Sequence, residues 1–273
     1  MRQGPQKVFA FALPRSGSTL LCDLLTVPGR SVMLHEPMML RNFGDGRETR
    51  ILETMSRLGI AVHSSPQHTS RGTPARHWYE TEVIPKLDNY QFWGIKEVYL
   101  TDAEQLIDQY RPDRILLLWR DPRDVALSLL ELMNRALMSF ADRKTLKDEA
   151  WALECLCSSA TTLGRLSSLY PHLLLRYEDM IQSPEHQRSL LQYVGLPGFG
   201  EDTIAMREDA FGIRDAELGR HSGRLSDRSV GRWHREPAGW RRTFAAVCHD
   251  AMQPLASQVG YDASQLRAIC PCA

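Results

Sequence analysis

Residues 8–21 read VFAFALPRSGSTLL, and this stretch decides the fold. Its apolar run, Val8 to Leu13, has the length of a buried strand. Pro14 to Ser18 have the composition of a loop, and Thr19 to Leu25 have helical character that stops before Pro28 and Gly29. The sequence therefore predicts a strand–loop–helix unit that opens an α/β domain.

The loop of this unit has the chemistry of an anion site. Backbone N–H groups at the entry to a helix attract phosphate, and Gly17 lets the backbone approach an anion closely. Ser16, Ser18 and Thr19 carry hydroxyl donors, and Arg15 can form paired hydrogen bonds to phosphate or sulfate oxygens. An ordinary capped helix, with a serine as N-cap, is the alternative. The stretch is not the G-x-x-x-x-G-K-[ST] loop of ATPases and GTPases, because it has no Lys-Ser/Thr pair.

Strand and helix patterns alternate along the rest of the chain. We expect further strands at 31–37, 92–98, 114–119 and 173–177, and helices at 101–110, 122–137, 145–169 and 183–195. This alternation predicts a single α/β domain over residues 1–273, with a central, mostly parallel sheet flanked by helices. The polar segment 40–80 has little periodicity and is expected to be an insertion or lid at an acceptor site. Residues 198–235 are expected to form a lid over a cofactor.

Charged residues follow four of the predicted strands. Ligands of parallel sheets bind at the carboxyl ends of the strands, so we expect Arg15, Glu36, Lys96 and Arg120 to converge on one edge. Ser128 lies two helical turns beyond Arg120, and the two side chains can grip one phosphate together.

The alternative for this second motif, RDPRDVALS at 120–128, is a solvated surface. Arg120 and Arg123 would then form ion pairs with Asp121 and Asp124.

Charge and hydropathy exclude several classes of protein. Lys+Arg and Asp+Glu each total 33, so the basic excess of a nucleic-acid-binding or membrane-surface protein is missing. No apolar stretch is long enough for a signal peptide or membrane anchor, and we expect a cytoplasmic protein without membrane partners. The six cysteines do not have zinc-site spacings, so no metal is expected.

The two motifs together resemble those of sulfotransferases that use 3′-phosphoadenosine 5′-phosphosulfate (PAPS). Residues 13–21 are similar to the family's 5′-phosphosulfate loop, and Arg120 with Ser128 matches its 3′-phosphate motif. Residues 176–180 resemble a later strand end of the family, and SVGRW at 229–233 with Gly260-Tyr261 resembles its C-terminal signature. The loop and His35-Glu-Pro37 are closest to bacterial, carbohydrate and tyrosyl-protein members. The cytosolic aryl and steroid branch instead has a lysine where this chain has Arg15.

The resemblance implies a P-loop-kinase-like sulfotransferase fold and an enzyme that moves a sulfuryl group from PAPS to a hydroxyl or an amine. The acceptor would be a small molecule, carbohydrate or natural product, and the product nucleotide would be 3′-phosphoadenosine 5′-phosphate (PAP). The cofactor-binding residues so implied are Arg15, Ser16, Gly17, Ser18, Thr19, Arg120, Ser128, Tyr177 and Arg232. Arg224 and Arg228 extend the same basic stretch.

The resemblance places the catalytic base at Glu36, with His35 as the alternative because histidine titrates nearer neutrality. Strand alternation predicts that these two side chains point to opposite faces, so that one of them faces the site. Arg15 and Lys96 are candidates to neutralise the charge of the leaving oxygen. Lys96 can instead form an ion pair with Glu97 or Glu36.

The acceptor site is the least defined part of the sequence. Trp78 and Tyr79 are candidates for its wall, and a place in the hydrophobic core is their alternative. Two other functions stay open: an ATP-dependent kinase with Asp121 as metal ligand, and a non-catalytic nucleotide-binding protein. The absence of a G-x-S-x-G motif argues against an α/β hydrolase. The sequence does not identify the acceptor or the oligomeric state.

Overall fold

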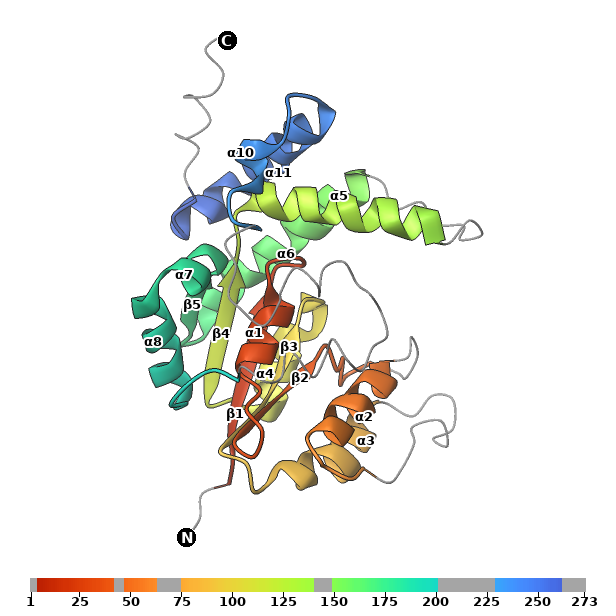
Figure 1. The fold of residues 1–273 in the computed structure, drawn as a ribbon, viewed down its shortest axis with the longest axis vertical. Coiled ribbons are helices and arrows are strands. Elements are labelled where there is room, and N and C mark those ends of the chain that lie inside the picture. Colours follow the sequence, from red (N-terminus) through yellow and green to blue (C-terminus); the bar gives the residue numbers. More distant parts are fainter. Residues whose placement is uncertain (1–3, 42–46, 63–74, 140–148, 201–228, 262–273) are drawn as a thin grey trace.

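The structure is a computed structural model that describes residues 4–41, 47–62, 75–139, 149–200 and 229–261 (Figure 1). One sheet is formed by β1 (Gln6–Ala12), β2 (Ser31–His35), β3 (Phe92–Glu97), β4 (Arg114–Trp119) and β5 (Leu173–Arg176). The strand order is β2-β3-β1-β4-β5, and every pair is parallel. The predicted parallel sheet is confirmed, with β1 at its centre.

Helices alternate with these strands as predicted. Their bounds are α1 (Ser18–Leu24), α2 (Arg47–Arg57), α3 (Ala75–Trp78), α4 (Ala103–Tyr110), α5 (Pro122–Ser139), α6 (Glu149–Leu169), α7 (Tyr177–Gln182), α8 (Pro184–Val194), α10 (Arg232–Arg235) and α11 (Trp240–Gln258). A π-helical turn (Tyr79–Val83) and two 3-10 turns (Ile84–Leu87 and Leu100–Asp102) complete them. None of the described helices has the length and apolar content to cross a membrane.

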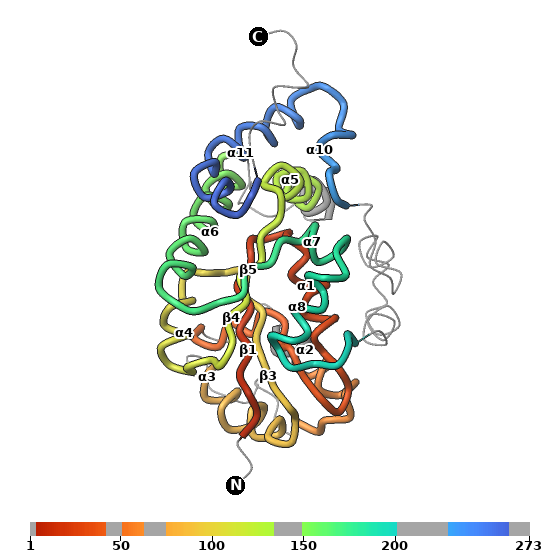
Figure 2. Tube along the Cα trace, turned by 90° about the vertical axis from the view of Figure 1, so that its left-hand side faces the viewer, coloured from red at the N-terminus to blue at the C-terminus, as the bar shows by residue number. Residues whose placement is uncertain are grey.

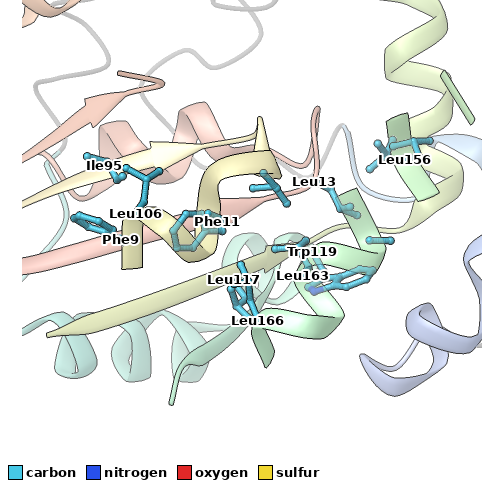
Figure 3. Packing of buried hydrophobic residues seen from close by; sticks show 14 of the residues in the cluster. Phe9, Phe11, Leu13, Ile95, Leu106, Leu117, Trp119, Leu156, Leu163 and Leu166 are labelled. Carbon is cyan, nitrogen blue, oxygen red and sulfur yellow. The ribbon is translucent and has the colours of Figure 1, made fainter. Parts of the chain in front are cut away.

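Two hydrophobic clusters cover the two faces of the sheet. Figure 2 shows α1 and α8 on one side of the strands and α4 and α6 on the other. On the α6 side, Phe9, Phe11 and Leu117 of the sheet pack with Leu163 and Leu166 (Figure 3). On the α1 side, the sheet contributes smaller side chains, including Val8, Ala10 and Leu116. Along β1, Val8 and Ala10 therefore face one side and Phe9 and Phe11 the other, which is the period-two pattern of a strand buried on both faces.

The segment 40–80 differs from its expected character as a polar insertion with little periodicity. Within it, α2 places Ile51 and Met55 in the core at zero exposure. Their spacing of four residues, continued by Leu58, is the helical signal that the surrounding polar residues obscured.

Trp78 and Tyr79 also lie in the core, 2% and 1% exposed, with ring centroids 4.9 Å apart. Their burial supports the core alternative over the acceptor-wall interpretation. Most of the expected lid at 198–235, including Arg224 and Arg228, lies outside the described residues.

Candidate active site

The carboxyl ends of all five strands lie at one edge of the sheet, because every strand pair is parallel. The loop after β1 is a tight turn at this edge. Both the N–H and the hydroxyl of Ser16 donate to the carbonyl of Leu13, at 3.2 and 2.6 Å. Ser16 is fully buried, so its described hydroxyl contact shapes the loop. Arg15 adopts a left-handed φ of 64°, a strained conformation for a residue with a side chain.

Two features require glycine at position 17: a left-handed backbone and the close approach of a neighbouring ring. Its φ is 86°, and a Cβ at this position would lie 2.3 Å from ring carbons of Tyr177. The Tyr177 ring, at the start of α7, therefore lies directly against the loop. Ser18 and Thr19 follow in the first turn of α1, where Ser18 is buried and Thr19 is half-buried.

The two predicted anion motifs are in direct contact. Nε of Arg15 donates to Oγ of Ser128 over 3.2 Å, across 113 residues of sequence. Nη1 of Arg120 donates to the carbonyl of Arg15 at 3.1 Å. The β1 loop, the end of β4 and the first turns of α5 therefore form one polar cluster.

Arg120 is buried, with 5% exposure. Besides Arg15, it donates through Nη2 to the carbonyl of Ser229 at 2.5 Å. Its guanidinium lies 4.7 Å from the centroid of the Tyr177 ring, whose hydroxyl is 2.6 Å from Oγ of Ser229. Nε of Arg120 has no hydrogen-bond partner among the described residues. A buried guanidinium with a donor to spare is suited to bind an anion.

The alternative interpretation of residues 120–124 is wrong about solvation, because all four charged residues are buried, but its ion pairs are present. Arg123 forms two hydrogen bonds to the carboxylate of Asp121, at 2.8 and 2.6 Å, and lies 3.8 Å over the ring of Trp233. Asp124 is fully buried and accepts the backbone N–H of Trp233 at 2.9 Å. Burial raises the pKa of Asp124 to about 6, against the opposing effect of Arg120, whose Nη2 lies 3.8 Å away.

Glu36 and Lys96 form an ion pair at the ends of β2 and β3. Nζ of Lys96, a fully buried side chain, donates to Oε1 of Glu36 at 2.5 Å. The backbone N–H of Glu36 donates to the carbonyl of Lys96 at 2.8 Å. The ion-pair alternative for Lys96 is thus the arrangement observed. Two strained residues, Glu36 and Met38, have φ values of 49° and 47°, and the N–H of Met38 donates to the buried Glu97 at 2.7 Å.

His35 and Glu36 do not alternate across a strand as predicted. β2 ends at His35, and the left-handed backbone of Glu36 breaks the period of two. Nε2 of His35 lies 2.9 Å from Oγ1 of Thr19, while Glu36 binds Lys96, which is the register partner of His35. Both candidate bases therefore reach the site edge.

The structure adds contacts that sequence reasoning missed. Arg232 forms an ion pair with Glu131 of α5. Glu178, the residue after Tyr177, accepts the backbone N–H of Asp121 at 3.0 Å and the hydroxyl of Tyr261 at 2.5 Å. The signal in the sequence that could have identified Glu178 is its position directly after the predicted strand at 173–177.

No protein-family model matches the sequence, and no curated protein matches it. Among solved structures, the chain is similar to the sulfotransferase domain from the curacin biosynthetic pathway. That match has a TM-score of 0.61 and 18% identity, and covers 96% of this chain and 99% of that one. Sulfotransferase STF9 from Mycobacterium avium gives a TM-score of 0.49 at 16% identity, covering 94% and 76% of the two chains. Mouse sulfotransferase SULT7A1 complexed with PAP gives 0.46 at 13%, covering 92% and 88%.

The likeness to the curacin domain identifies the class of fold. The chain is a single domain with the P-loop-like α/β fold of sulfotransferases. This confirms the fold that the motif resemblance implied.

Proposed function

We propose that the chain is a sulfotransferase that moves a sulfuryl group from PAPS to a hydroxyl of a small-molecule, carbohydrate or natural-product acceptor. One observation carries the proposal: the predicted 5′-phosphosulfate loop and the predicted 3′-phosphate motif touch each other, through Arg15, Ser128 and Arg120. A nucleotide with phosphates at both its 3′ and 5′ positions needs two anion grips held together. The fold, shared with the curacin sulfotransferase domain, agrees with this function.

The residues present fit such a nucleotide. Arg120 is buried and keeps Nε without a partner among the described residues, next to the aromatic face of Tyr177. In the proposed site, Arg120 and Ser128 hold the 3′-phosphate, and Arg15 with residues 16–19 holds the 5′ side. Arg15 is close to both grips, because its side chain contacts Ser128 while its carbonyl accepts from Arg120.

PAPS supplies an activated sulfuryl group, whose bond to the 5′-phosphate breaks as the acceptor oxygen bonds to sulfur. Glu36 accepts the proton that the acceptor hydroxyl loses. Lys96, at 2.5 Å from Oε1 of Glu36, orients this carboxylate and places a buried positive charge beside it. Arg15 offsets the negative charge that develops on the leaving oxygen.

The kinase alternative is less well supported. It needs Asp121 as a metal ligand, but both carboxylate oxygens of Asp121 accept hydrogen bonds from Arg123. A metal would have to displace a buried arginine from this pair.

Calorimetry of the purified chain with PAP, AMP and ATP tests the nucleotide assignment. We expect PAP to bind most tightly, because AMP and ATP lack the 3′-phosphate that Arg120 and Ser128 would hold. Equal affinity for the three nucleotides would contradict the proposal. Incubation with labelled PAPS and panels of sugars, phenols, lipid alcohols and peptides then identifies the acceptor, and Mg²⁺-dependent ATP turnover would instead support the kinase.

A further inference from the structure

We propose that Glu178 is a positioning residue for the 3′-phosphate grip, and that the hydroxyl of Tyr261 holds it in place. The inference rests on the proposed function, since it assumes that Arg120 binds a 3′-phosphate. Neither residue touches Arg120 through a described side-chain contact. Their effect passes through the backbone of the turn that carries Arg120.

Glu178 joins two parts of the chain that are distant in sequence. Its Oε1 accepts the N–H of Asp121 at 3.0 Å, and its Oε2 accepts the hydroxyl of Tyr261 at 2.5 Å. The N–H of Asp121 belongs to the peptide that links it to Arg120. This hydrogen bond therefore fixes the peptide plane from which the Arg120 side chain departs.

The rest of the Asp121 turn is held locally. The carboxylate of Asp121 binds Arg123, and its carbonyl accepts the N–H of Val125 at 3.0 Å. These contacts fix the shape of the turn, and Arg120 ties it to the loop after β1, but none of them ties it to the end of β5. Glu178 supplies that tie, because it lies two residues beyond Arg176 of β5, the register partner of Trp119 in β4.

Tyr261 is built to hold Glu178 through its hydroxyl. It is 4% exposed, and the guanidinium of Arg176 lies 4.5 Å from its ring centroid. Its backbone N–H donates to the carbonyl of Ala256 at the end of α11. Burial and the charge of Glu178 raise the pKa of Tyr261 well above its ordinary value, so the phenol keeps its proton and donates.

The end of β5 thus connects three parts of the site through consecutive residues. Arg176 contacts the ring of Tyr261, Tyr177 lies against Gly17 and Arg120, and Glu178 binds the Arg120 turn. A shift of Glu178 would move the Arg120 turn relative to the Tyr177 ring. The expected result is weaker binding of the 3′-phosphate, with a smaller effect on the 5′ side, which Arg120 contacts through the carbonyl of Arg15.

The test compares the dissociation constants of PAP and AMP for four variants. Tyr261→Phe removes one hydroxyl, Glu178→Ala removes both hydrogen bonds, and Glu178→Gln keeps an acceptor for the N–H of Asp121. Tyr110→Phe is the matched control, because its half-buried hydroxyl donates to Glu80 at 3.1 Å on the α6 face. Thermal unfolding of each variant checks that it is folded.

We expect Tyr261→Phe to weaken the binding of PAP about threefold to tenfold, while the affinity for AMP changes little. The loss is a fraction of the contribution of a hydrogen bond to a charged group, because the effect on Arg120 is indirect. Glu178→Ala should weaken PAP further, and Glu178→Gln should restore much of the preference for PAP. Tyr110→Phe should leave the PAP-to-AMP ratio at the wild-type value. These results separate positioning from a general loss of stability, which would weaken both nucleotides alike.

Different outcomes overturn different claims. A wild-type chain that does not prefer PAP over AMP contradicts the proposed function itself. A wild-type chain that prefers PAP, with folded Tyr261→Phe and Glu178→Ala variants that keep the same preference, overturns the role of Glu178 alone. An equal loss of PAP and AMP affinity in these variants also overturns it.

Discussion

Two guanidinium nitrogens of Arg120 donate hydrogen bonds to backbone carbonyls, those of Arg15 and Ser229. The side chain therefore orders the β1 loop and the segment before α10, in addition to any anion that it binds. Because these contacts keep the guanidinium in one place, little rotamer entropy remains to be lost when a phosphate binds.

Arg120→Ala should weaken PAP by about 1.5–3 kcal/mol, roughly a 10- to 150-fold loss of affinity, if a charged hydrogen-bonded pair is removed. Calorimetry with PAP and AMP measures this loss. The affinity for AMP should fall less, through the lost contact of Arg120 with the carbonyl of Arg15 alone. Arg114→Ala is the matched control, since Arg114 lies at the opposite end of β4 and binds the carbonyl of Tyr193. Unchanged PAP affinity in Arg120→Ala would show that the 3′-phosphate motif is misplaced.

Glu36→Gln should leave PAP affinity near the wild-type value and reduce turnover about 10²–10⁴-fold, the usual contribution of a general base. The amide keeps the shape of the side chain and an acceptor for Lys96, but it is a very weak base. His35→Ala should reduce turnover less, because in this proposal His35 supports Thr19 of the cofactor loop and does not accept the proton. Steady-state rates at saturating PAPS measure both variants, and the reverse ranking would assign the base to His35.

The sequence predicted which residue types stand at the strand ends, because an apolar run followed by a charged residue is a local pattern. It did not predict all of their partners. The pair of Lys96 with Glu36 was one of two alternatives, and the contact of Ser16 within its own turn was not predicted. The partner of Arg232 is Glu131 of α5, and such a contact between elements depends on helix packing, which no short stretch of sequence contains.

Among the described elements, α10 is one that depends on its neighbours for stability. A helix of four residues has too few internal hydrogen bonds to be stable alone. Three contacts hold it to α5. The N–H of Trp233 donates to Asp124, the guanidinium of Arg123 lies over the ring of Trp233, and Arg232 forms an ion pair with Glu131. The described C-terminal segment is thus fixed to the helix that carries Ser128.

Asp124→Asn should change how stability depends on pH. The carboxyl binds its proton more tightly in the folded chain, where the pKa is about 6, than at its ordinary value of 3.8 in the unfolded chain. The resulting stabilisation is present at low pH and is lost as the pH rises through about 6. As the pH falls from about 7.5 to about 4.5, the free energy of unfolding of the wild type should rise by roughly 2 kcal/mol relative to that of Asp124→Asn. Urea unfolding of both proteins at the two pH values measures this change. The same difference in free energy of unfolding at both pH values would contradict the prediction.

The elements themselves were predictable to different degrees. β4 matches its predicted bounds of 114–119, and β3 ends one residue before the predicted end. β4 is a continuous apolar run after Arg114, and β3 begins with the large apolar residues Phe92 and Trp93. By contrast, α2 was not predicted, because Ile51 and Met55, which are fully buried, lie among charged and polar neighbours. A narrow apolar stripe gives a weak periodic signal in a short helix.

Over the whole molecule, the alternation of strands and helices predicted a parallel sheet, but not the order of its strands. The order β2-β3-β1-β4-β5 depends on where each crossover connection returns to the sheet. Several orders satisfy the same alternation, and the choice among them comes from long-range packing.

A ligand that contacts several strand ends should stabilise the entire domain. PAP at about 100 times its dissociation constant should raise the free energy of unfolding by about 2.7 kcal/mol. For a chain of this size, that corresponds to a rise in the unfolding temperature of roughly 5–10 °C. Thermal scans with PAP and with AMP at the same concentration measure it. AMP should give a smaller shift, and equal shifts would count against a specific 3′-phosphate site.

The contacts of Arg120 and Glu178 with the C-terminal part of the chain have a consequence during protein synthesis. A chain emerging from the ribosome exposes the β1 loop and the Arg120 turn long before Ser229 and Tyr261 have been translated. Arg120 then lacks its Ser229 carbonyl, and Glu178 lacks its phenol partner. The proposed nucleotide site therefore reaches its final geometry only after translation has passed residue 261.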